Sequence, residues 1–245
     1  MQLNQFFFKI VKSQPQLPED PLMKDIGAAF KFQFQDPNWV SKMFLGTLFE
    51  FLSILLIGSW LVMGYQVEVI QRVMRKEEKV LPEWDRLSEK LLRGIKLFLV
   101  SLIYYIPVAI LVLILILFVG ISTTFHSAEA EALTGITFVT AIIFIVLPYT
   151  LFISILLPVI YLEFARNEHM GDALNIARVL NFFVRNWQNV IILALIMLGV
   201  YILSAFGILF CIIGVFFTSF YAKLVSAHLT GQLHLGSPEV QASAT

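Results

Sequence analysis

The sequence predicts an all-α integral membrane protein with six transmembrane helices, arranged as three helical hairpins, together with interfacial amphipathic helices. Of its 245 residues, 58% are hydrophobic and 14% are charged, whereas a soluble domain carries about 25% charged residues. The apolar residues gather in runs of eighteen or more, which is typical of helices in lipid. This composition excludes a soluble enzyme, a disordered chain and a disulfide-stapled secreted domain. The 17 cations are balanced by 17 anions, which argues against a nucleic-acid partner.

The chain is expected to divide into three parts. Residues 1–23 form an N-terminal interfacial strip and a linker, because the apolar stretch at 6–11 is too short for a signal peptide. Three prolines at 15, 18 and 21 predict an extended linker. Residues 24–233 form a single polytopic membrane domain, and residues 234–245 form a flexible C-terminal tail.

Four apolar runs define the membrane domain, at 41–75, 95–120, 133–162 and 188–229. A spanning helix needs about 20 residues, so each of the two middle runs gives one helix, and together they form a hairpin kinked by prolines. The first and last runs are long enough to fold back on themselves. We expect their turns at Gly58-Ser59 and at Phe206-Gly207.

The distribution of charge supports this folding. With both outer runs folded back, all 17 lysines and arginines lie on one side of the membrane, whereas the loop at 121–132 contains Glu129 and Glu131 and no cation. Because cations are enriched on the cytoplasmic side, both termini are expected in the cytoplasm. If the first run were instead one straight span, the protein would have five membrane helices.

An internal repeat supports the same arrangement. Asn38-Trp39 and Asn186-Trp187 each open an apolar run, and each follows an amphipathic stretch. Before the second pair, Asp172 is expected to cap a helix that lies in the membrane plane. Its apolar face would carry Ile176, Leu180 and Phe183, and its polar face Arg178 and Arg185. The pattern indicates a duplicated unit in parallel orientation on either side of the middle hairpin.

Two sets of polar residues at membrane depth are candidate sites. Glu50 lies within the first run, where an ionisable side chain is unfavourable and often functional. A turn at Gly58 would place it against Tyr65 or Gln66, either as a structural clasp or as part of a proton or ion pathway. The second set follows the middle hairpin, where prolines free backbone carbonyls that need partners or a wet cavity. It consists of Tyr104, Tyr105, Pro107, Pro148, Tyr149, Ser154 and Pro158.

The cytoplasmic face is a third candidate, because basic residues near a membrane attract anionic lipid headgroups. This face consists of Arg72, Arg75, Lys76, Lys79, Trp84, Arg178 and Arg185. No sequence motif for catalysis, metal or cofactor binding occurs, so no enzyme activity is expected. The first functional hypothesis is therefore a non-catalytic scaffold, assembly or membrane-shaping component with lipid, a second copy or a membrane complex as partner. The alternative is a small oligomeric transporter or channel along the middle hairpin.

Several short segments carry a resemblance to a known family. They are Met63-Gly64-Tyr65, Ile70-Gln71-Arg72-Val73, Leu81-Pro82-Glu83-Trp84-Asp85, Gly94-Ile95-Lys96, Tyr104-Tyr105-Ile106-Pro107 and, near the end, Ile213-Gly214-Val215-Phe216-Phe217, Tyr221-Ala222, Ala227-His228-Leu229 and Gly231-Gln232. Together these segments resemble the uncharacterised prokaryotic membrane family DUF4013 over about residues 31–233. The resemblance implies a multi-pass protein of a bacterial or archaeal cell membrane. It implies no activity.

Overall fold

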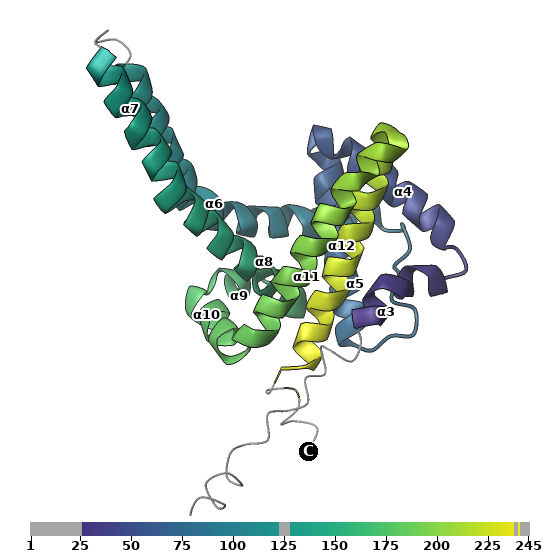
Figure 1. Cartoon of the computed structure of the whole chain (residues 1–245). Coiled ribbons are helices and arrows are strands. Elements are labelled where there is room, and N and C mark those ends of the chain that lie inside the picture. The colour runs from purple at the N-terminus through teal and green to yellow at the C-terminus, as the bar shows by residue number, and fades with distance from the viewer. Residues whose placement is uncertain (1–25, 123–127, 238–239, 241–245) are drawn as a thin grey trace, which may run out of the picture.

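The computed structural model of the chain describes residues 26–122, 128–237 and 240, and every regular element in them is helical (Figure 1). The prediction of an all-α fold is therefore confirmed for these residues. The expected N-terminal strip and linker, and most of the tail, lie outside them. The elements are α3 (Ile26–Lys31), η1 (Phe32–Gln35), α4 (Trp39–Phe51), η2 (Leu52–Leu55), α5 (Ile57–Met74), α6 (Leu87–Ser122), α7 (Ala128–Ala141), η4 (Ile142–Val146), α8 (Leu147–Asn167), α9 (Met170–Leu174), α10 (Ile176–Arg185), α11 (Trp187–Ala205), η5 (Phe206–Phe210) and α12 (Cys211–Leu235).

Three stretches of the described chain are long and apolar enough to span a membrane, at Leu87–Ile121, Leu133–Asn167 and Trp187–Leu209. They support a membrane protein, but they number three rather than the six expected. The first apolar run contains no such stretch, for two physical reasons. Helix α4 has 13 residues, or about 20 Å of helix, and the second half of α5 carries Glu68, Gln71 and Arg72.

The first apolar run is broken, but earlier than predicted. A short 3-10 helix, η2, follows α4, and Leu56 adopts a left-handed backbone with φ of 64°. Helix α5 then begins at Ile57, so Gly58 and Ser59 lie in its first turn rather than between two helices. In the last run the turn is η5 at Phe206–Phe210, which includes the predicted Phe206-Gly207. Side chains at both turns are strongly exposed and apolar, such as Ile54 and Leu209.

The middle helices form an arm that projects away from the rest of the molecule (Figure 1). Helix α6 bends along its length, and Pro107 lies inside it, as expected where a proline removes a hydrogen bond. Helices α7 and α8 are joined by the π-helical η4 just before Pro148, and such a widened turn is a common form of helix irregularity. Because α7 begins at Ala128, the connection after α6 is shorter than the predicted loop at 121–132.

The second Asn-Trp pair is preceded by a helix, but its cap differs from the prediction. Asn175, not Asp172, caps α10 by accepting a hydrogen bond from the backbone N–H of Arg178 at 3.0 Å. The residues that α10 buries are Val179 and Phe182; of the predicted apolar face, Leu180 and Phe183 pack partly buried against the core, and Ile176 is 60% exposed. Asn38 and Asn186 share similar backbone angles before α4 and α11, but these helices have 13 and 19 residues. The two copies of the expected repeat therefore differ in length.

Helices α5 and α6 cross so closely that their backbones touch. A Cβ added to Gly64 would overlap the backbone of Lys90, and a Cβ added to Gly94 would overlap the carbonyl of Trp60. Glycine at both positions therefore sets the distance between the helices, as small residues do in membrane helix pairs. Around this crossing, Tyr65 and Leu97 are completely buried.

We expect Gly64→Ala to destabilise the protein, because the methyl group meets backbone that cannot move aside. Overpacking of this kind destabilises by about 1–3 kcal/mol. Gly199→Ala in α11 is the matched control, since a Cβ there meets nothing within 4 Å. Alanine at such an open helical site is expected to stabilise by about 0.5–1 kcal/mol. Thermal unfolding of both variants in one detergent tests the pair; equal melting temperatures would contradict a close crossing at Gly64.

Candidate functional site

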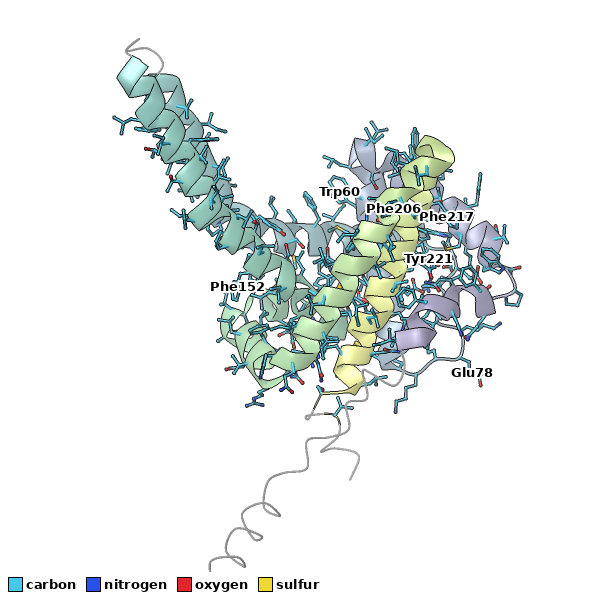
Figure 2. The ribbon with its side chains drawn as sticks, in the orientation of Figure 1. Trp60, Glu78, Phe152, Phe206, Phe217 and Tyr221 are labelled. Atoms are coloured by element: carbon cyan, nitrogen blue, oxygen red, sulfur yellow. The ribbon has the colours of Figure 1, made fainter. Side chains whose placement is uncertain are left out.

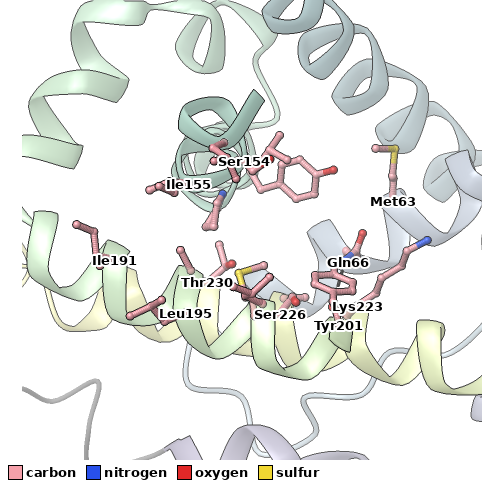
Figure 3. A pocket seen from close by; sticks show the side chains of 18 of the residues that line it. Met63, Gln66, Ser154, Ile155, Ile191, Leu195, Tyr201, Lys223, Ser226 and Thr230 are labelled. Carbon is pink, nitrogen blue, oxygen red and sulfur yellow. Dashed lines mark hydrogen bonds between the residues drawn. The ribbon is translucent and has the colours of Figure 1, made fainter. Parts of the chain in front are cut away.

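A cavity of about 610 Å³ lies among α5, α6, α8, α11 and α12, within the usual range for small-molecule sites. Most of its wall is apolar and comes from α8 and α11. These apolar residues are Leu151, Ile155, Leu157, Pro158, Ile191, Ala194, Leu195, Met197 and Leu198. Figure 3 shows Ile155 on one side of this space and Ile191 and Leu195 on the other.

One face of α12 supplies a large share of the polar lining, and no prediction from the sequence included this face. Lys223, Ser226 and Thr230 all line the cavity, and their spacing of three and four residues places them on one side of a helix. Gln66 from α5 and Tyr201 from α11 join them (Figure 3). The spacing was a visible signal, but nothing in the sequence indicated which face of this long apolar run would border an open space.

Glu50 finds a different partner from the one predicted. Both of its carboxylate oxygens accept from Lys223 Nζ, at 2.6 and 2.8 Å, and Oε1 also accepts from Ser219 at 2.9 Å. Gln66 donates instead to the backbone carbonyl of Lys223 at 3.1 Å. Because α4 is short and crosses α12, Glu50 faces α12 rather than Tyr65. It is part of an ion pair at one end of the cavity.

Tyr65 and Trp84 belong to a packed contact outside the cavity. The Tyr65 hydroxyl donates to the Pro82 carbonyl at 2.7 Å, and the two rings stack with centroids 4.1 Å apart. The Trp84 indole N–H donates to the carbonyl of Lys42 at 2.9 Å. Trp84 therefore holds the loop after α5 against α4 and α5.

The polar stripe of the middle hairpin is divided between packing and the cavity. The Tyr104 hydroxyl donates to the Ala173 carbonyl, and the Tyr149 hydroxyl donates to the Tyr104 carbonyl, both at 2.7 Å. Of the predicted set only Ser154 and Pro158 line the cavity, while Tyr105, Pro107 and Pro148 do not. The prolines therefore do not open onto one common polar space.

Two of the six cations of the predicted lipid face, Arg72 and Arg178, are held by the protein's own buried carboxylates. Arg72 and the buried Lys90 bind the two oxygens of Glu68 at 2.8 and 2.6 Å. The side chain of Glu163, completely buried, pairs with Arg166 and Arg178 at 2.6 and 2.8 Å. The predicted cations that stay exposed are Arg75, Lys76, Lys79 and Arg185. The basic face is therefore smaller than the sequence indicated.

A further ion pair fixes the start of α4. Lys42 Nζ binds Asp36 and Glu83, each at 2.6 Å, and donates to the Leu81 carbonyl at 3.2 Å. Burial raises the pKa of Asp36, but the hydrogen bond and charge of Lys42 outweigh it and leave the pKa below its usual value. The pKa of Asp172 is also lowered, by a hydrogen bond from Asn167 and by the charge of Arg178. Within the described residues, no group of three or more side chains could hold a metal ion.

We expect Glu68→Gln to destabilise the protein by about 3 kcal/mol, because it leaves the buried ammonium of Lys90 without its close carboxylate. Glu89→Gln is the matched control, since Glu89 is about half exposed and its partners Arg86 and Arg93 lie at 3.4 and 3.8 Å. The control is expected to change stability by less than about 0.5 kcal/mol. Chemical denaturation of both variants in one detergent measures the difference, and a loss at Glu68 no larger than at Glu89 would refute the assignment.

Comparison with known proteins gives one match. No curated protein and no solved structure matches the chain. The family described as "Protein of unknown function (DUF4013)" matches residues 48–218. The matched segment contains the α5–α6 crossing, the Trp84 loop, the middle arm and most of the apolar cavity wall. Because the match covers more than half of the chain and confirms the resemblance seen in the sequence, the protein belongs to the DUF4013 family.

Proposed function

We propose that this protein is a non-catalytic, multi-pass protein of a bacterial or archaeal plasma membrane that binds a lipid-phase molecule in its cavity. The observation that carries the proposal is the cavity itself, whose volume of about 610 Å³ is walled mainly by aliphatic side chains. A pocket of this size and lining suits a small apolar or amphipathic ligand.

The opening of the cavity supports a ligand that arrives from the bilayer. Three of the lining leucines, Leu151, Leu195 and Leu198, are more than half exposed. They lie on two of the helices that are apolar enough to cross a membrane. In such a position their exposed surface would face hydrocarbon, so a ligand could enter sideways without passing through water.

The proposed orientation follows from the ends of the helices. Figure 2 shows Phe206, at the α11–α12 turn, toward one end of the molecule and Glu78, in the loop after α5, toward the other. The charged end would be cytoplasmic by the positive-inside rule. We retain three hairpins in this proposal, with α4 and α5 as a shorter one that dips into the membrane and returns. Both chain termini are then cytoplasmic.

The other functional hypotheses have less support. A membrane-shaping or scaffolding role through the basic face would depend on four exposed cations, because Arg72 and Arg178 are bound to Glu68 and Glu163. These four are Arg75, Lys76, Lys79 and Arg185. A channel along the middle hairpin would need free tyrosine hydroxyls there, whereas those of Tyr104 and Tyr149 are bonded to carbonyls. The proposal needs lipid as a partner and requires no second copy.

Filling the cavity is expected to weaken binding. In Ala194→Trp the indole would occupy the space between α11 and α8, whereas Ala205→Trp places the same ring elsewhere on α11. The full chain, purified in mild detergent, is titrated with monooleoylglycerol and with 1-oleoylglycerol 3-phosphate by native mass spectrometry. At least one of them should bind one to one, tenfold more weakly in Ala194→Trp and unchanged in Ala205→Trp. Failure of both to bind the unmodified protein would refute the proposed function.

Cysteine labelling in intact cells tests the orientation. Cys211 is first replaced by serine, and single cysteines are then placed at Lys76 and at Ser127. A membrane-impermeant maleimide is expected to label the cysteine at 127 in intact cells and the one at 76 only after the membrane is opened. External labelling at position 76 would reverse the proposed orientation.

A further inference from the structure

Many of the polar groups of the cavity lie along α12 and at one end, opposite a mainly aliphatic wall in which Ser154 and Tyr161 are the polar residues of α8. Figure 3 shows Lys223 and Gln66 at this end, with Ser226 and Thr230 farther along α12 and Ile191 and Leu195 toward the other end. A ligand that matches this pattern has a polar head at the Lys223 end and a hydrocarbon chain along α8 and α11. The distribution therefore favours an amphipathic molecule over a purely apolar one.

Hydrogen-bonding groups are available at the polar end. Ser226 is 3% exposed, and its hydroxyl, next to Tyr201, makes no hydrogen bond of good geometry within the described residues. The Tyr201 hydroxyl satisfies this buried group only partly, and an incompletely bonded buried hydroxyl is unfavourable, so an oxygen supplied by a ligand would stabilise it. Tyr201 lies at this end of the cavity, and Thr230, 2% exposed, lies farther along α12 (Figure 3). These hydroxyls can both donate and accept.

The charge at this end is already neutralised. Among the described residues that line the cavity, one is charged, and it is Lys223. Glu50 binds its ammonium through both carboxylate oxygens. Figure 3 shows this ammonium turned outward, past Gln66. An anionic head would have to displace the Glu50 carboxylate or bind close to it, and like charges so near each other repel.

From these observations we infer that the ligand is an uncharged single-chain amphiphile whose head carries hydroxyl or carbonyl oxygens. This inference rests on the proposed function, because it names the class of molecule that the cavity takes. The head bonds to Ser226 and Tyr201, and the chain lies between Ile155 and Leu195. The Glu50–Lys223 pair selects against anionic lipids by neutralising the one cation at the polar end of the described lining.

Two probes that differ by one phosphate group test the inference. Monooleoylglycerol and 1-oleoylglycerol 3-phosphate share their chain and glycerol, and each is titrated into the full chain in a neutral detergent by native mass spectrometry. We expect the uncharged probe to bind at least tenfold more tightly. Ser226→Ala should weaken its binding about fivefold, whereas Ser204→Ala, on α11 and outside the lining, should leave it unchanged. Equal or tighter binding of the phosphate probe, or no effect of Ser226→Ala, would overturn the inference.

Glu50→Gln provides an independent arm, because it removes the carboxylate and leaves Lys223 as an unopposed cation. The phosphate probe should then bind at least tenfold more tightly than it does to the unmodified protein, with little change for monooleoylglycerol. An unchanged affinity for the phosphate probe would contradict the role given to Glu50. If this variant does not fold, the Ser226→Ala result decides. If both probes bind equally and Ala194→Trp weakens both, the inference fails while the proposed function stands.

Discussion

The contact on which the rest of the fold depends is the crossing of α5 and α6 at Gly64 and Gly94, where the two backbones touch. This proximity brings Lys90, with 1% of its side chain exposed, against Glu68 at 2.6 Å. A buried charge is tolerated only when it is paired and hydrogen-bonded, so the crossing and the ion pair require each other. The same crossing buries Tyr65, on whose ring Trp84 stacks. The segments of the family pattern that contain Tyr65, Trp84 and Gly94 thus meet around one contact, which gives this part of the pattern a structural meaning.

Helix α12 connects this contact to the cavity. Near its end, Gly231 lies against Val73 of α5, and farther back Phe220 lies against Gly46 of α4. Between these contacts, Lys223 binds Glu50, and the polar face of α12 borders the cavity. Figure 1 shows the arm diverging from α11, so the aliphatic side chains of α8 and α11 do not close the space between them. The cavity is therefore a consequence of how the arm leaves the bundle.

The ion pairs also change the functional interpretation of the charges. In the sequence, cations beside a membrane suggest attraction to anionic lipid. In the structure, Arg72, Lys90, Arg166, Arg178 and Lys223 all have carboxylate partners within 2.8 Å. A cation held in this way offers a headgroup much less than its formal charge implies. The lipid recognition that we propose therefore rests on the shaped apolar cavity rather than on a basic surface.

The sequence by itself determined the properties that depend on neighbouring residues. Apolar runs predicted an all-α membrane protein, Pro107 and Pro148 indicated where the middle helices are irregular, and the turn at Phe206-Gly207 was found within η5. The tertiary structure decided which distant groups meet. Glu50 pairs with Lys223, 173 positions away, and the direction of the short α4 makes that contact possible while excluding Tyr65. Trp84 was grouped with the basic cytoplasmic face, and the structure shows that its ring stacks on Tyr65. Local sequence pattern cannot specify such partners, because they depend on where helices cross. The α5–α6 crossing in turn depends on Gly64 and Gly94, whose role appears only when the two backbones touch.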